Sequence, residues 1–134
     1  MRLHSSRMMN WLGMVVVMAV ASLANAAAHE NFTLDDFEVS DTESLLDVCT
    51  LDEAHETYWE AAAFCLGFFQ GGVQYHRALA NGPNFDPIAC PTDDVTLKQL
   101  VSVFTDYARA NPIYLDQPPM DTVFRAVADQ WPCE

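Results

Sequence analysis

The chain has 134 residues and a formal net charge of −13 at pH 7, with 19 acidic residues against 6 basic ones. Such an acidic chain lacks the basic footprint that nucleic acid requires, and it is poorly suited to an anionic membrane surface. Its length is that of one domain, and 51% of its residues are hydrophobic, which is enough for a core.

The first 26 to 28 residues have the pattern of a secretory signal peptide. A basic start precedes the apolar residues 11–21, and Ala24-Asn25-Ala26 offers small residues to a signal peptidase. The apolar run is too short for a permanent membrane anchor. We therefore expect cleavage after Ala26 or Ala28 and a single exported domain over residues 27–134. Its net charge would be near −15, because 4 basic and all 19 acidic residues remain.

Residues 27–39 are expected to form an irregular lead-in, because their apolar residues recur at mixed spacing. The segment Ser40-Asp41-Thr42-Glu43 then has the pattern of a capping box. In this arrangement Ser40 would cap the helix and Glu43 would reach back to the capping residue. A short helix over residues 41–50, with one apolar side, should follow.

The longest apolar stretch of the exported part, residues 58–76, predicts a central helix from about residue 53 to residue 76 or 79. Trp59, Leu66 and Phe69 recur at helical spacing and share one face. Phe64 and Phe68 add a second apolar row. A helix that is apolar on more than one side is typically enclosed in a bundle, so we expect the shorter helices to surround this one.

Two glycines, Gly67 and Gly71, lie one turn apart within this helix. A glycine in a helix interior costs about 1 kcal/mol relative to alanine. We therefore expect both to be helix-packing residues, at which another helix approaches closely.

The segment Asn81-Gly82-Pro83-Asn84-Phe85-Asp86-Pro87 has the composition of a loop. Its one large apolar residue, Phe85, has two interpretations. It is either an exposed knob for a binding partner or a side chain that folds back over the core. The second interpretation is favoured.

Two further helices are predicted in the second half. Leu97, Leu100 and Phe104 follow helical spacing within residues 94–110, and Asn111-Pro112 ends that helix. Pro118-Pro119 suits the first turn of a last helix, over about residues 119–130. No segment alternates like a strand. The sequence thus predicts an all-α fold, a small bundle of four to five helices.

Four cysteines follow the signal peptide, at positions Cys49, Cys65, Cys90 and Cys133. An even number in an exported chain indicates two disulfides, and four cysteines allow three pairings. An antiparallel arrangement of the last two helices would bring Cys90 near Cys133 and leave Cys49 with Cys65. On the loop-entropy model these bridges would stabilise the fold by roughly 4 and 3 kcal/mol.

The chemistry of an enzyme is not indicated. There is neither a Gly-rich phosphate loop nor a nucleophile elbow, and His29, His55 and His76 share no ligand spacing. A zinc site made of His55, Glu56 and His76 is an alternative that we do not favour. The sequence predicts no catalytic residue, no cofactor and no metal.

Acidic residues are concentrated in the first half of the exported part. Residues 27–76 contain 11 acidic residues and no lysine or arginine. Such a surface speeds the association of a basic protein, or it only keeps the chain soluble. The candidate partner-binding residues are an acidic face and a loop, namely Asp47, Asp52, Glu53, Glu56 and Glu60, and Asn84, Phe85 and Asp86.

These elements together resemble the Rap/Tai immunity proteins of bacterial type VI secretion systems. The segment Cys65-Leu66-Gly67-Phe68-Phe69-Gln70-Gly71 is similar to the Cys-x-Gly-aromatic-x-x-Gly element of that family. Cys49 fits upstream of it, and the resemblance covers residues 45–133. The later signals follow in the family's order, as Cys90-Pro91, Leu97, Gln99-Leu100-Val101, Tyr107, Asn111-Pro112 and Trp131-Pro132-Cys133.

The resemblance implies a periplasmic, disulfide-containing helical domain that is commonly a homodimer. Such proteins bind peptidoglycan-cleaving amidase toxins, which use a Cys–His pair. They block the toxin's cleft with a surface loop or helix, which requires no catalytic residue. The alternative function is a periplasmic stress, chaperone-like or adaptor protein of the same fold. A tight, stoichiometric complex with one toxin would distinguish the two.

Overall fold

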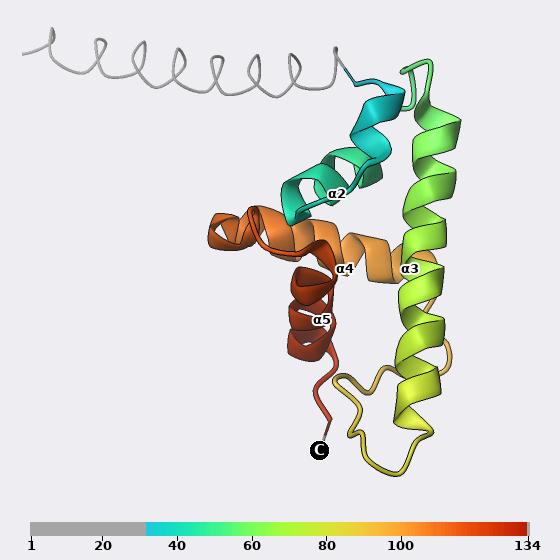
Figure 1. Cartoon of the computed structure of the whole chain (residues 1–134), viewed down its shortest axis with the longest axis vertical. Coiled ribbons are helices and arrows are strands. Elements are labelled where there is room, and N and C mark those ends of the chain that lie inside the picture. Colours follow the sequence, from blue (N-terminus) through green and yellow to red (C-terminus); the bar gives the residue numbers. More distant parts are fainter. Residues whose placement is uncertain (1–31, 134) are drawn as a thin grey trace, which may run out of the picture. The chain divides into compact units, whose positions relative to one another are not determined.

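The computed structural model describes residues 32–133 (Figure 1). These residues contain four α-helices, two 3-10 helices and no strand, which confirms the all-α fold. The predicted signal peptide and His29 lie outside the described residues. The elements are η1 (Leu34–Phe37), α2 (Thr42–Cys49), α3 (Tyr58–Ala80), α4 (Leu97–Ala110), η2 (Pro112–Tyr114) and α5 (Pro119–Gln130).

All of these elements belong to one compact unit, which begins at Thr33. Its core contains Leu45 and Val48 of α2, Phe104 of α4 and Ala126 of α5, each with at most 1% of its surface exposed. Within the described part of the chain, no helix is long and apolar enough to cross a membrane.

Helix α2 begins with a capping box that lies one residue later than predicted. Asp41, in extended conformation, is the N-cap, and its Oδ1 accepts from the Ser44 backbone N–H (2.9 Å). Ser44 Oγ in turn accepts from the Asp41 N–H (3.2 Å). The prediction that Ser40 and Glu43 form the box is therefore wrong. Asp41 and Ser44 have the same three-residue spacing, and a carboxylate acceptor makes the stronger bond to the helix amide.

Helix α3 begins at Tyr58, about five residues later than predicted. Side chains in the preceding turn bond to backbone amides close by in sequence. Asp52 Oδ1 accepts from the Ala54 N–H (2.8 Å), and His55 Nδ1 accepts from the Thr57 N–H (3.2 Å). These local bonds offer the backbone an alternative to the helix and delay its start.

The buried face of α3 also differs from the predicted one. Ala61, Cys65 and Phe69 are buried, whereas Trp59 is 77% exposed and Leu66 is 43% exposed. The helix is thus covered on one side and is not enclosed. Because α3 is apolar nearly all round, its sequence does not determine which of its sides faces the core. The disulfide from Cys65 to α2 holds the side that carries Cys65 against the other helices.

Gly67 and Gly71 therefore lie on the uncovered side of α3. A Cβ atom built at either position would meet no atom within 4 Å. The expected close approach of another helix is not made within the described chain. A packing role for these two glycines stays a prediction, and it now concerns a second molecule.

Helices α4 and α5 complete the core. α4 is capped by Thr96, whose Oγ1 accepts from the Gln99 N–H (3.2 Å), and it starts three residues later than predicted. Its Phe104 meets Phe69 of α3, with ring centroids 5.5 Å apart. α5 has the predicted bounds. It crosses α4 in Figure 1 rather than running antiparallel to it, so that part of the prediction is wrong.

Both predicted disulfides are present. Cys49 is bonded to Cys65 with a Cα–Cα distance of 5.3 Å, and Cys90 is bonded to Cys133 at 5.0 Å. The second pair does not require antiparallel helices. Residues 91–96 separate Cys90 from the start of α4, and this segment is long enough to bring Cys90 to Cys133. The first bridge joins α2 to α3, and the second joins the segment before α4 to the end of the chain.

Candidate functional site

The two groups of predicted contact residues lie at opposite ends of α3 (Figure 1). Asp52, Glu53 and Glu56 occupy the turn before the helix, and Asn84 and Asp86 occupy the segment after it. A helix of 23 residues is about 33 Å long. The acidic face and the loop are therefore two separate surfaces.

The acidic face is largely open to solvent. Glu53, Glu56 and Glu60 are exposed, while Asp47 on α2 is half-buried. The carboxylate of Asp52 is exposed but already accepts the Ala54 amide. Glu60 belongs to the first turn of α3, where a negative charge is favourable to the helix dipole. Part of this acidic surface thus has a role in the fold itself.

The segment after α3, residues 81–96, which we call the α3–α4 loop, forms the second surface. Phe85 is half-buried, and its ring lies against that of His76 in an edge-to-face arrangement, with centroids 5.9 Å apart. This confirms the interpretation that Phe85 folds back onto the protein. Asn84 and Asp86, on either side of it, are exposed.

His76 receives a second contact from the same loop. The backbone N–H of Ile88 donates to His76 Nε2 at 3.0 Å. An N–H group can only donate, so Nε2 is the acceptor in this bond. On its other side the imidazole lies against Phe124 of α5, with ring centroids 5.9 Å apart. From the sequence, His76 was weighed only as a metal ligand.

The disulfide between Cys90 and Cys133 fixes the loop further along. The Cys90 N–H donates to the carbonyl oxygen of Trp131 (2.9 Å), just beyond α5. Cys133 Sγ lies 3.5 Å from the carbonyl oxygen of Pro87. The α3–α4 loop is therefore held to α3 through His76 and to the end of α5 through Cys90.

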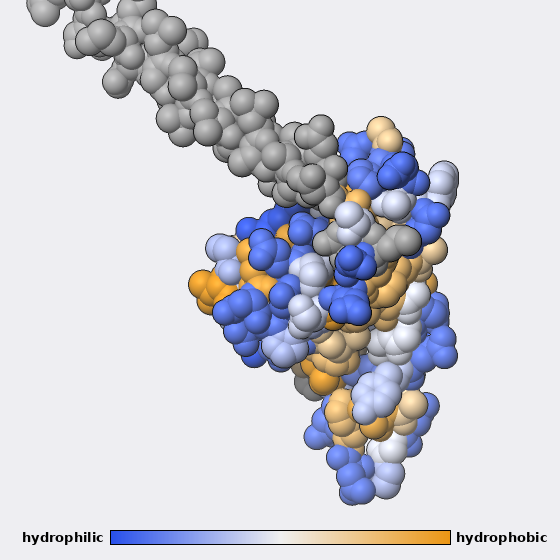
Figure 2. All heavy atoms as spheres, turned by 45° about the horizontal axis from the view of Figure 1, so that its top comes forward, coloured by the Kyte–Doolittle hydropathy of each residue, from blue (hydrophilic) through white to orange (hydrophobic). Residues whose placement is uncertain are grey.

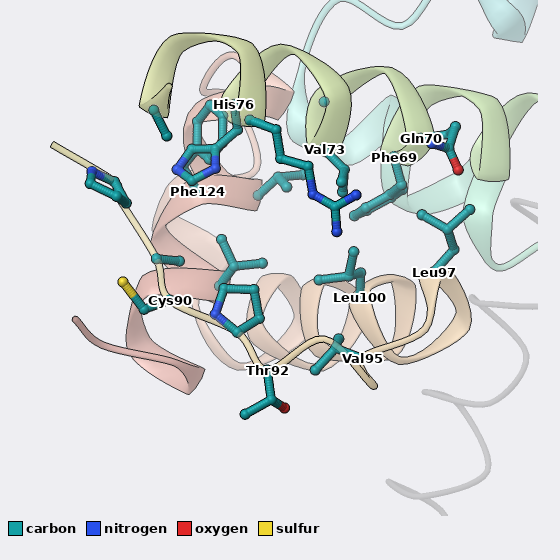
Figure 3. Close-up of a pocket in the computed structure, with 18 of the residues that line it drawn as sticks. Phe69, Gln70, Val73, His76, Cys90, Thr92, Val95, Leu97, Leu100 and Phe124 are labelled. Carbon is teal, nitrogen blue, oxygen red and sulfur yellow. The ribbon is translucent and has the colours of Figure 1, made fainter. Parts of the chain in front are cut away.

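Behind the loop lies a groove of about 640 Å³ between α3, the later part of the loop, α4 and α5 (Figure 3). Val73 and Phe69 of α3 face Leu100 of α4 across it, and Phe124 closes one end. Arg77 and Asp93 supply charge to its lining. Residues 69–100 and the distant residues 120–127 of α5 build this groove together, so no local pattern could have predicted it.

The zinc alternative is wrong. His55 lies before α3 and His76 near its far end, so they cannot share an ion with Glu56. Over residues 32–133, no three His, Cys, Asp or Glu side chains form a group that could hold a metal.

An aromatic cluster stands at the junction of α4, η2 and α5. The rings of Tyr107 and Tyr114 are stacked, with centroids 6.1 Å apart, and the Arg125 guanidinium lies 5.0 Å from the Tyr114 ring centre. Arg125 also pairs with Asp121 (2.9 Å). Burial raises the pKa of the Tyr107 hydroxyl, and the nearby Tyr114 and Asp129 raise it as well. The cluster joins α4, η2 and α5 at this corner of the fold.

Large apolar side chains are exposed on both flanks of the two glycines of α3, with Trp59 and Leu66 on one flank and Tyr75 on the opposite one. Trp59, Leu66 and Tyr75 are 77%, 43% and 64% exposed. On the face of the molecule seen in Figure 2, apolar surface lies in patches between hydrophilic areas. Exposed aromatic residues next to small ones are typical of an interaction surface.

Comparison with known proteins identifies the family. The model of the Rap1a immunity proteins matches residues 41–133, which extend from the N-cap of α2 to the second disulfide. The comparisons with curated proteins and with solved structures gave no match. The matched region contains all four α-helices, both disulfides and the α3–α4 loop, and the chain therefore belongs to the Rap1a immunity proteins.

Proposed function

We propose that the chain is a periplasmic immunity protein that binds a peptidoglycan amidase toxin delivered by type VI secretion and occludes its active site. Membership of the Rap1a immunity proteins carries the proposal. The pattern of a signal peptide and the two disulfides support a location in an oxidising compartment outside the cytoplasm. The toxin's substrate lies in that same compartment.

The α3–α4 loop is the element that we propose enters the toxin's cleft. It follows the free end of the longest helix, and its residues Asn84 and Asp86 are exposed. The contacts of His76 and the disulfide at Cys90 hold its shape. An inhibitor that acts by occupying a cleft needs a shaped protrusion and no reactive group, which agrees with the side chains that this loop presents.

We also propose that the protein is a homodimer and that α3 contributes to the interface. Trp59 and Leu66 give apolar area to one flank of the uncovered side, and Gly67 and Gly71 beside them would let a second helix approach closely. This surface is distinct from the tip of the loop. A dimer formed through it would leave both loops accessible to toxin.

The test uses the mature, oxidised protein as bait for candidate amidase toxins from the same organism. We expect one amidase to be retained and its release of fragments from purified peptidoglycan to stop at an equimolar ratio. A sample with reduced and alkylated cysteines is the control, and it shows whether inhibition requires the disulfide-bonded fold. Retention of many weakly bound proteins, without inhibition of any amidase, would contradict the proposal and favour the chaperone-like alternative.

A further inference from the structure

The first part of the α3–α4 loop folds back against one side chain of α3, that of His76. Residues 81 and 82 still bond to the last turn of α3, through Arg77 and Leu79 carbonyl oxygens. The ring of Phe85 and the backbone N–H of Ile88 then both meet His76, at 5.9 Å between ring centroids and 3.0 Å between N and Nε2. The next fixed point is the disulfide at Cys90.

We infer that His76 is a positioning residue that holds the α3–α4 loop in the shape in which it meets its partner. Its consequence for toxin binding rests on the proposed function. The imidazole makes two different contacts with the loop, a ring contact with Phe85 and a hydrogen bond from Ile88. Phe124 supports the ring from α5.

The physical reason is the entropy of the loop. Each residue that is ordered only on binding costs about 1–2 kcal/mol, which is subtracted from the affinity. The disulfide fixes one end of the segment and α3 fixes the other, but neither constrains Asn84 to Asp86 directly. The contacts of His76 on both sides of Asp86, at Phe85 and Ile88, provide that constraint.

The two contacts can be separated by substitution. His76→Phe keeps an aromatic ring between Phe85 and Phe124 but removes the acceptor for the Ile88 N–H. His76→Gln removes the ring but places a side-chain oxygen near the position of Nε2. His76 is half-buried at the surface end of α3 and lies outside the fully buried core, so both variants should fold. Lys98→Gln changes an exposed residue of α4 and is the control.

The first measurement is hydrogen exchange of the Ile88 amide, followed by NMR in the mature oxidised protein. Losing one neutral hydrogen bond changes the equilibrium between the protected and the open state of an amide by a factor of about five. We expect His76→Phe to speed this exchange about fivefold or more, while amides in the middle of α4 keep their wild-type rates. His76→Gln should restore part of the protection, and Lys98→Gln should leave the exchange of the Ile88 amide unchanged.

The second measurement is inhibition of the amidase that the wild-type protein retains. His76→Phe should raise the inhibition constant about fivefold, and His76→Gln should recover part of the loss. Unchanged Ile88 exchange in His76→Phe, or inhibition equal to wild type in both variants, would overturn the inference. If the wild-type protein inhibits no amidase, the proposed function fails, while the exchange rates still decide whether His76 positions the loop.

Discussion

The hydroxyl oxygens of Thr42 and Thr122 lie 2.8 Å apart, and neither side chain has any exposed surface. They join the first residue of α2 to α5 across 80 positions of sequence. Thr42 Oγ1 also lies 3.0 Å from the carbonyl oxygen of Gln117, and that oxygen accepts the Thr42 N–H (2.9 Å). The start of α2 is thereby bonded to the connection that precedes α5.

Substitution within this pair should be strongly non-additive. Thr42→Val or Thr122→Val leaves a buried hydroxyl with a missing partner, so each should lower the free energy of unfolding by about 1–3 kcal/mol. The double variant should cost less than the sum, because it removes both hydroxyls at once. Urea unfolding of the four proteins measures the coupling. Strict additivity would show that the two hydroxyls act independently.

The cap of α2 predicts a dependence of stability on pH. The Ser44 backbone N–H and then the Ser44 hydroxyl lower the pKa of Asp41 from its ordinary value of 3.8. The unfolded chain therefore takes up a proton at a higher pH than the folded one, and the stabilisation from the carboxylate is lost as the pH falls from 3.8 through the lower folded value.

Variants of Asp41 separate charge from capping. Asp41→Ala should lower the free energy of unfolding by about 1 kcal/mol at neutral pH. Asp41→Asn should keep most of the cap and lose this acid dependence. Urea midpoints measured from neutral pH down to about pH 2 test both expectations. An Asp41→Asn variant with the same acid profile as wild type would assign the dependence to other carboxylates.

The uncovered glycines of α3 should be sites of stabilising substitution in the monomer. Because a Cβ at Gly67 or Gly71 meets no atom within 4 Å, Gly→Ala should raise the free energy of unfolding by about 1 kcal/mol at each. Gly72→Ala is the control, since its Cβ would lie 3.0 Å from Met120 Cε. Unfolding is measured at a dilution where the protein is monomeric. No gain at Gly67 would indicate a contact on that side.

The proposed dimer can be tested on the same side of the helix. Leu66→Glu places a charge on the exposed apolar flank that Leu66 shares with Trp59, and it should convert the dimer to a monomer that stays folded. Light scattering after size-exclusion chromatography reports the mass. Ile113→Glu is the control, because Ile113 is an apolar residue of η2 that is 74% exposed and lies outside α3, and this change should leave the dimer intact. Equal effects of both substitutions would place the interface elsewhere.

The acidic face should affect how fast the toxin binds. Changing Glu53, Glu56 and Glu60 together to lysine should slow association, most at low salt, and leave dissociation nearly unchanged. Surface plasmon resonance at two salt concentrations measures both rates. The matched control changes the same number of exposed carboxylates elsewhere, at Asp106, Asp116 and Asp129. Equal on-rates in the two triple variants would show that net charge alone is responsible.

Local signals predicted much of the fold. The bounds of α5 are set by Pro119 at its start and by Trp131-Pro132 beyond its end, and both are visible in the sequence. The pairing of the four cysteines was predicted correctly, although the prediction relied on an antiparallel arrangement of α4 and α5 that the structure does not have. The start of α3 was misplaced, because the Asp52 and His55 side chains bond to the backbone of a turn that is otherwise helical in composition.

The orientation of α3 and the details of the site depend on contacts between distant segments. An apolar helix offers several faces, and Cys49 selects one of them from another helix. The role of His76 depends on Ile88, twelve residues later in an irregular segment, and on Phe124 from α5. No periodic pattern links these positions, so only the folded chain shows that they meet.

The two disulfides join the cysteines in the order in which they occur along the chain, Cys49 with Cys65 and Cys90 with Cys133. The two covalent rings are therefore consecutive, and neither encloses the other. A chain that emerges from its N-terminal end can close the first ring before Cys90 appears, when only one partner is available. Oxidation in the order of synthesis would yield the native pairs directly, without a catalyst that reshuffles wrong pairs.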